Sequence, residues 1–159
     1  MLLERENTDP NRPDENDQTP LGYAVIEGLA EVVRLLLERE NVDPNRPDKY
    51  DRTPLGWVAM KGHEGVVKLL RELEDVDPGH PDTDGGTPLG CDALEGHEHV
   101  VKSLLEREDV DHNRPGKYDR TSLGWAANVN HREVSQYLVV SHMATMKTTT
   151  KKCNNSTNS

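Results

Sequence analysis

The 159-residue sequence contains no phenylalanine and only four tyrosines and two tryptophans, and apolar residues make up 33% of it. Burial of apolar surface is the main force that opposes the entropy of the chain, so a single thick globular core is hard to build from this composition. A stack of small units relaxes that demand, because each unit needs to cover only its neighbours.

Long apolar runs and paired cysteines are also missing. No run of about 18 apolar residues exists, and the N-terminus lacks the basic and then apolar pattern of a secretion signal. The two cysteines, Cys91 and Cys153, are distant in sequence, and the second lies in a polar tail, so a disulfide framework has no support. We therefore expect an intracellular protein, located in the cytoplasm, with no membrane partner.

Basic residues are too few for a protein that binds nucleic acid. The chain has 19 lysines and arginines against 29 acidic residues, a net charge of -10. The last 17 residues hold three lysines and no acid, so the rest of the chain carries -13. Such an acidic body repels phosphate backbones, which are recognised through clustered lysines and arginines. We expect no nucleic-acid partner.

What the sequence does contain is a repeat with a period of 34 residues. Residues 14–47 and 48–81 are identical at 17 of 34 positions, which excludes coincidence. The clearest repeated motif is Thr-Pro-Leu-Gly, with Thr-Ser-Leu-Gly in the last copy, and it begins at Thr19, Thr53, Thr87 and Thr121.

Local rules predict two short helices in each repeat. The threonine is a good N-cap and the proline suits the first helical position, so a first helix begins at Pro20, Pro54 and Pro88. It ends about two turns later, where a glycine or asparagine can adopt the left-handed conformation, at Gly28, Gly62, Gly96 and Asn130. A second helix follows with apolar residues at helical spacing, such as Val66, Val67 and Leu70.

The segments between repeats cannot be helical. Residues 42–51 contain two prolines, which exclude a helix, and aspartates and asparagines that favour turns. We expect a projecting loop or hairpin at each such junction. The apolar stripes of the second helices must then meet those of neighbouring repeats, because one helix pair cannot bury its own stripe.

The repeated segments resemble the ankyrin repeat over residues 1–141. The resemblance rests on Thr53-Pro54-Leu55-Gly56-Trp57-Val58-Ala59, on Gly62-His63 and on Val66-Val67-Lys68-Leu69-Leu70. It implies an all-α solenoid of stacked helix-turn-helix units joined by projecting loops or β-hairpins. It also implies a scaffold that binds proteins and does not catalyse a reaction. The acidic linkers look like those of fungal-type ankyrin arrays.

The repeat divides the chain into six segments. Residues 1–13 align with residues 35–47, so we expect the chain to open inside a truncated repeat and to derive from a longer array. Residues 143–159 are rich in Thr, Lys, Asn and Ser and lack periodicity, so we expect disorder there. The segments are a truncated repeat at 1–13, repeats at 14–47, 48–81 and 82–115, a terminal repeat at 116–142 and a disordered tail at 143–159.

Two departures from the family motif predict a softer array. The motif histidine is replaced by Gly22, Gly56, Gly90 and Gly124, and glycine inside a helix costs roughly 1 kcal/mol relative to alanine. In the third repeat, Asp92 occupies the small apolar position held by Ala24, Val58 and Ala126. A carboxylate that faces a core seam costs several kcal/mol unless it is paired or protonated. The third repeat is therefore the predicted weak point.

Residue spacing argues against the two candidate chemical sites in the sequence. Cys91, Asp92, His97, Glu98 and His99 cluster in sequence, but His97 and His99 are two residues apart and do not share a helix face. Residues 82–86 are similar to a calcium loop, but the twelfth position holds alanine where glutamate is required, so we predict a turn. We predict no catalytic residue, no metal ion, no cofactor and no small-molecule substrate.

Trp57 and Trp125 occupy equivalent positions in their first helices. They could form a stacking pair for a ligand or pack the seam between repeats, and packing is the more common use of such residues.

The resemblance implies that partners bind to the hairpin tips and the end of each first helix, which line the concave face of ankyrin proteins. These positions vary in chemistry while the frame repeats, as on a binding surface carried by a fixed scaffold. The alternative is a structural spacer or decayed array fragment with no partner of its own. The candidate residues are Glu15, Asn16, Gln18, Ile26 and Glu27; Lys49, Tyr50, Arg52, Met60 and Lys61; Thr83, Asp84, Gly86, Leu94 and Glu95; and Lys117, Tyr118, Arg120, Asn128 and Val129.

Two of the four tips share the sequence Lys-Tyr-Asp-Arg, at 49–52 and 117–120. Tyrosine and arginine often carry the energy of an interface. We therefore predict two matching contacts with a protein partner, at Tyr50 with Arg52 and at Tyr118 with Arg120. Asp84, in the tip between them, favours a basic group of that partner.

Overall fold

The computed structural model describes the backbone of residues 9–155 and the side chains in that range other than those of Lys117 and residues 146–155. Within these residues the chain forms α-helices and one short 3-10 turn, and no β-strand. The all-α fold is as predicted, and the junctions between repeats are loops rather than paired strands. None of the described helices is both long enough and apolar enough to cross a membrane.

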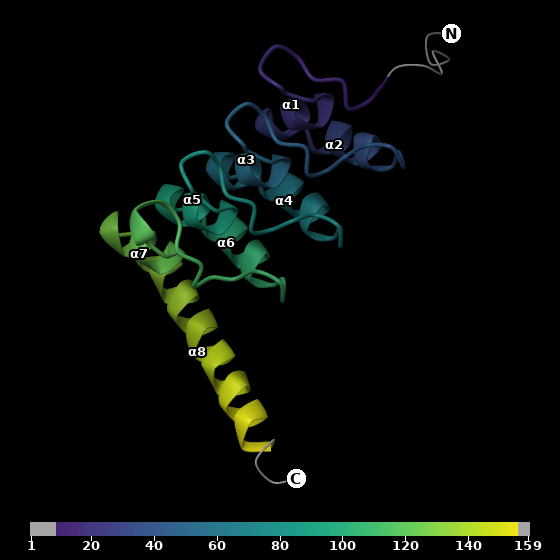
Figure 1. Ribbon diagram of the computed structural model, residues 1–159. Helices are drawn as coiled ribbons and strands as arrows, with labels where there is room; N and C mark the ends of the chain where they lie inside the picture. Colours follow the sequence, from purple (N-terminus) through teal and green to yellow (C-terminus); the bar gives the residue numbers. More distant parts are fainter. Residues whose placement is uncertain (1–8, 156–159) are drawn as a thin grey trace.

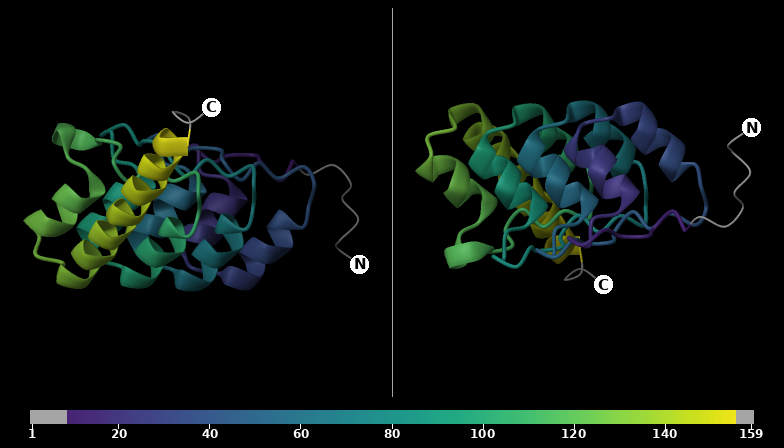
Figure 2. Two further views of the ribbon diagram at one scale, coloured as in Figure 1. Left: turned by 90° about the horizontal axis from the view of Figure 1, so that it is seen from below. Right: turned by 90° about the horizontal axis from the view of Figure 1, so that it is seen from above.

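The helices come in pairs that stack side by side (Figure 1). The first helices of the pairs form one row and the second helices form another (Figure 2). The first row contains α1 (Pro20–Ile26), α3 (Pro54–Lys61), α5 (Pro88–Glu95) and α7 (Ser122–Asn128). The second row contains α2 (Ala30–Leu37), α4 (Glu64–Arg71), α6 (Glu98–Leu105) and α8 (Arg132–Asn155), and the 3-10 turn η1 spans Lys117–Asp119.

The predicted helix caps are present. Each capping threonine accepts a hydrogen bond from the amide of the glycine three residues later, at 3.1 Å for Thr19 and 3.3 Å for Thr121. These glycines stand where the family motif has histidine. Gly62 and Gly96 close α3 and α5 in the left-handed conformation, with φ of 73° and 83°.

The core runs along the seam between the two rows. Val67, Val101 and Leu104 are fully buried, as the apolar stripes of the second helices predicted. Stacking explains the burial: Val66 in the second repeat is fully buried, whereas its counterpart Val32 in the first repeat, which has no described repeat before it, is 43% exposed.

Histidines at the turn between the two helices join consecutive repeats. A ring nitrogen of His63 lies 2.9 Å from the carbonyl oxygen of Ile26, and His131 lies 3.0 Å from that of Leu94. His97 makes the corresponding bond through Nδ1, 3.0 Å from the carbonyl oxygen of Ala59. Each bond satisfies a carbonyl near the end of the preceding first helix.

Asp92 lies in the core of the third repeat, as predicted, with 0% of its surface exposed. Neither carboxyl oxygen has a hydrogen-bond partner. Nδ1 of His97 is 3.3 Å from Asp92 Oδ1 and nearer, at 3.0 Å, to the carbonyl oxygen of Ala59. Burial raises the pKa of Asp92 to about 9, so the side chain is protonated at neutral pH.

The C-terminal segment differs from the predicted disordered tail. α8 continues through residues 143–155 and extends away from the stack in Figure 1. Val134 and Leu138 anchor its first turns in the core, and no glycine or proline follows to end it. The Thr145 hydroxyl also bonds back to the carbonyl of His142 at 2.8 Å. Residues 156–159 and residues 1–8 of the predicted truncated repeat lie outside the described residues.

Candidate functional site

The four loop tips lie along one edge of the stack, beside the row of first helices (Figure 1). In the first three repeats an aspartate shapes the tip, because its Oδ1 accepts two backbone amides. Asp48 Oδ1 accepts from Tyr50 at 2.8 Å and Arg52 at 3.1 Å, and Asp82 Oδ1 accepts from Asp84 at 3.0 Å and Gly86 at 2.8 Å. Asp82 therefore forms the turn that the sequence predicted.

Backbone hydrogen bonds join the first three tips into a row. The amide of Lys49 donates to the carbonyl of Asn16 at 3.1 Å, and the amide of Thr83 donates to that of Tyr50 at 2.9 Å. The exposed side chains of these tips are thus presented at fixed spacing on a connected backbone.

The fourth tip has a different conformation. Gly116 stands where the other repeats have the turn-forming aspartate, so the two side-chain bonds are absent. The chain instead forms η1, in which Tyr118 has a left-handed φ of 60°, unlike Tyr50, whereas Asp119 at 56° matches Asp51 at 59°. The two Lys-Tyr-Asp-Arg segments therefore have the same sequence and different backbones.

None of the predicted partner-binding residues whose side chains are described is buried, and Lys117 is the one whose side chain is not described. The half-buried members are Gln18, Ile26, Arg52, Met60, Gly86 and Leu94. The exposed members are Glu15, Asn16, Glu27, Lys49, Tyr50, Lys61, Thr83, Asp84, Glu95, Tyr118, Arg120, Asn128 and Val129.

In the second repeat, Arg52 and Trp57 form a cation–π pair. The Arg52 guanidinium lies 5.0 Å from the centre of the Trp57 ring and 5.3 Å from that of Tyr50. The Trp57 indole N–H donates to Asp48 Oδ2 at 3.0 Å. Trp57 also packs against the core cluster, which agrees with its interpretation as a seam residue.

The fourth repeat carries the same pair with a more open tyrosine. The guanidinium of Arg120 lies 4.9 Å from the Trp125 ring centre. Tyr118 is 74% exposed, and its ring centre is 6.2 Å from that of Trp125. Trp125 is half-buried and lines a surface cavity, whereas Trp57 packs against the core cluster.

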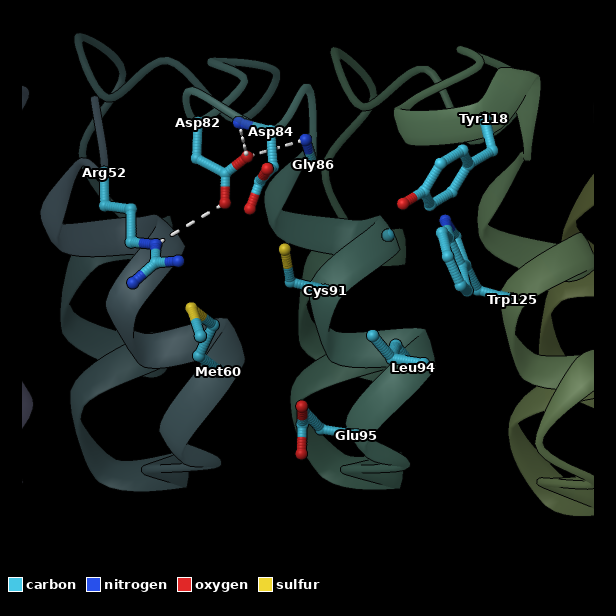
Figure 3. Close-up of a pocket in the computed structure, with 11 residues that line it drawn as sticks. Arg52, Met60, Asp82, Asp84, Gly86, Cys91, Leu94, Glu95, Tyr118 and Trp125 are labelled. Atoms are coloured by element: carbon cyan, nitrogen blue, oxygen red, sulfur yellow. Dashed lines mark hydrogen bonds and ion pairs between the residues drawn. The ribbon is translucent and has the colours of Figure 1, made fainter. Parts of the chain in front are cut away.

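A cavity of about 230 Å³ opens between these two repeats, over the first helix of the third (Figure 3). Arg52 and Met60 lie on one side of it and Tyr118 and Trp125 on the other, with Cys91 between them. The remaining lining residues are Asp82, Asp84, Gly86, Gly90, Leu94 and Glu95.

Of the lining residues, Asp82 forms an ion pair and Cys91 is a neutral thiol. Asp82 Oδ2 is 3.4 Å from Nε of Arg52, a long ion pair. Burial, and after it the negative charge of Asp82, raises the pKa of the Cys91 thiol to about 11. Cys91 is therefore a neutral thiol at neutral pH and not an activated nucleophile.

The structure brings together predicted residues from three repeats at this cavity, among them Arg52, Met60, Leu94 and Tyr118. The predicted residues of the first repeat do not line this cavity. Asp82, Cys91 and Trp125 were not predicted as binding residues. Comparison of the repeats position by position offers a signal for one of them, because Cys91 stands where the other repeats have Tyr23, Trp57 and Trp125.

The sequence cluster around Cys91 does not form one site in the structure, although His97 Nδ1 lies 3.3 Å from Asp92 Oδ1. Cys91 faces the concave cavity, Asp92 faces the core, and His97 contacts the preceding repeat. In the described part of the chain, no three His, Cys, Asp or Glu side chains are placed to hold a metal ion.

Comparison with known proteins gives the family. A comparison with curated proteins found no match. A family model described as ankyrin repeats (3 copies) matches residues 1–78 and 66–150, which together cover most of the sequence. Repeats of this family are generally protein-protein interaction modules, and their fold is not a catalytic one. With its 34-residue period, stacked helix pairs and histidine links between repeats, the chain belongs to the ankyrin-repeat family.

Proposed function

We propose that this protein binds a protein partner through its loop tips and the ends of its first helices, and that it has no catalytic activity. The observation that carries the proposal is the row of tips itself. Hydrogen bonds hold the backbone of the first three tips in one repeated arrangement, while the exposed side chains change from tip to tip. A surface of this kind suits recognition by a rigid scaffold.

The chemistry along the row alternates. The first tip presents Glu15, the second Lys49 and Arg52, the third Asp84, and the fourth Arg120. A partner with complementary charges would be oriented along the array, because complementary charges favour one register over others.

Tyr50 and Tyr118 are the anchors in this proposal. Both are exposed large apolar side chains, and Tyr50 lies between Lys49 Nζ, 5.1 Å from its ring centre, and the Arg52 guanidinium. Tyrosine buries a large rigid surface on binding and keeps a hydroxyl for a hydrogen bond. Because the two tips differ in backbone, each tyrosine would contact its own site on the partner.

The test uses the intact chain to capture the partner from an extract of its source cell and then measures affinity. Tyr50→Ala and Tyr118→Ala should each weaken binding by roughly 1 to 2 kcal/mol, and leave the melting temperature nearly unchanged. Leu35→Ala, which removes an exposed apolar side chain on α2, should bind as the parent does. If both tyrosine variants also bind as the parent does, the proposed surface is wrong.

A further inference from the structure

The third repeat lacks both members of the pair that its neighbours share. Arg52 and Arg120 stack on Trp57 and Trp125 in the second and fourth repeats. One period from each, the third repeat has glycine at 86 in place of arginine and cysteine at 91 in place of tryptophan. The cavity of about 230 Å³ lies over these two positions.

The backbone around the cavity has the same turn and helix ends as the second repeat, so the space comes from the side chains. Asp82 still forms its turn, Thr87 still caps α5, and α5 ends at Gly96 as α3 ends at Gly62. A Cβ atom added at Gly86 would lie 2.9 Å from Cys91 Sγ and 3.2 Å from Asp82 Oδ1. Any side chain at position 86 would therefore reduce the opening.

One carboxylate oxygen in the cavity lacks the indole donor that its counterpart in the second repeat has. In the second repeat, Asp48 Oδ2 accepts the Trp57 indole N–H at 3.0 Å. The equivalent Asp82 Oδ2 has in its place the long 3.4 Å contact with Arg52 Nε. An N–H donor that enters the cavity would restore the missing bond, and a charged donor would make it stronger.

The charges and the walls of the cavity fit a cation with a flat apolar face. The lining carries three carboxylates, on Asp82, Asp84 and Glu95, against the guanidinium of Arg52, which already pairs with Asp82. Outside the lining, the guanidinium of Arg120 lies 4.9 Å from the Trp125 ring centre, so the carboxylates still outnumber the nearby guanidinium groups. Trp125 and Tyr118 form an aromatic wall opposite it (Figure 3). A guanidinium stacks on aromatic rings and donates to a carboxylate in a planar fork, whereas an ammonium group cannot do both in this way.

We propose that this cavity accepts an arginine side chain of the protein partner. The proposal rests on the protein-binding function proposed above and specifies its chemistry. The incoming guanidinium takes the place of the missing pair: it packs against the aromatic wall of Tyr118 and Trp125 and donates N–H groups to Asp82 Oδ2, while the charge of Glu95 adds attraction. The partner thus supplies the guanidinium group that the third repeat lacks.

The experiment titrates the intact ¹⁵N-labelled chain with the peptide acetyl-Gly-Arg-Gly-amide and follows its NMR spectrum. We expect saturable shifts at the amides of Gly86 and Leu94 and at the Trp125 indole N–H. Peptides with glutamine or lysine in place of arginine should bind at least fivefold more weakly. Equal binding of the glutamine peptide would overturn the site, and equal binding of the lysine peptide would overturn the assignment to arginine.

Two variants separate occupancy of the cavity from other effects. The double substitution Gly86→Arg with Cys91→Trp installs the pair of the neighbouring repeats and should weaken the arginine peptide at least tenfold. Glu95→Gln, an exposed change that leaves the cavity open, should weaken it several-fold. Parental affinity in both variants would show that the peptide binds elsewhere and would overturn the proposal.

Failure of the cavity assignment can be distinguished from failure of the proposed tip contacts. If the tyrosine variants lose the captured partner but the arginine peptide does not bind, the cavity assignment fails and the protein-binding surface stands. If the peptide binds in the cavity but both tyrosine variants retain the partner, the tip contacts fail and the cavity assignment stands.

Discussion

The second and third repeats have the same turns and helix caps, but their side chains differ at three key positions. The second places Trp57 under Arg52 and Val58 in the core. The third places Cys91 and Gly86 at the first two positions and a buried, unpaired Asp92 at the third. The comparison teaches that a repeat with the same caps, turns and buried stripe keeps its fold when one core position and two surface positions change.

The largest effect should come from removing the buried acid. Asp92→Ala should raise the free energy of unfolding by roughly 2 to 4 kcal/mol at pH 7, because the unfolded chain gains ionisation that the folded chain does not. The measurement is the urea midpoint with its slope. Val58→Asp, the matched change in the second repeat, should destabilise the protein. A neutral or negative change in Asp92→Ala would show that the carboxyl group is usefully paired.

Placing the cysteine of the third repeat at the equivalent position of the second should destabilise the protein. Trp57→Cys should lower the free energy of unfolding by about 2 kcal/mol, because it removes the stack on Arg52, the bond to Asp48 and buried indole surface. The control is Trp125→Cys, which removes a ring that is absent from the main core cluster and should cost less. Equal losses in the two variants would contradict the distinction between a seam tryptophan and a surface one.

The buried acid also predicts a dependence on pH. Asp92 has a pKa raised from 3.8 to about 9 in the folded state, so the unfolded state loses its proton first as pH rises. This group's contribution is therefore fully present below about pH 4 and declines by up to about 1.4 kcal/mol per pH unit until pH 9.

Asp92→Asn removes that titration and keeps the shape of the side chain, so it is the reference for this prediction. The stability advantage of Asp92→Asn over the parent should grow between pH 5 and pH 8 in urea titrations. His97, whose Nδ1 lies 3.3 Å from Asp92 Oδ1, is present in both proteins, so the two differ only at position 92. An advantage that stays constant with pH would mean that Asp92 is ionised in the folded state.

Much of the frame follows from sequence, because it depends on local rules repeated four times. Thr53 with Pro54 predicts the start of α3, Gly62 predicts its end, and Val66 with Val67 predicts the buried stripe of α4. The exceptional position of Asp92 also follows, since the repeat shows what its counterparts are. In each case a single repeat, compared with its copies, contains the information.

The features that sequence did not predict depend on what surrounds a residue. The continuation of α8 to Asn155 depends on an anchored helix that no residue stops, while composition alone indicated disorder. The two Lys-Tyr-Asp-Arg tips differ because Gly116, outside the motif, lacks the carboxylate of Asp48. The cavity requires side chains from three repeats at once, so it is invisible in any one of them.

Native-state hydrogen exchange tests the central contrast between the two interior repeats most directly. Both have a repeat on each side, so fraying at the ends of the stack affects them less than the terminal repeats. The amides of Asp92 and Ala93 in α5 should exchange roughly tenfold faster than those of Val58 and Ala59 in α3 at neutral pH. Equal protection of the two helices, or faster exchange in α3, would contradict the account of the third repeat as the open and weakened unit of the array.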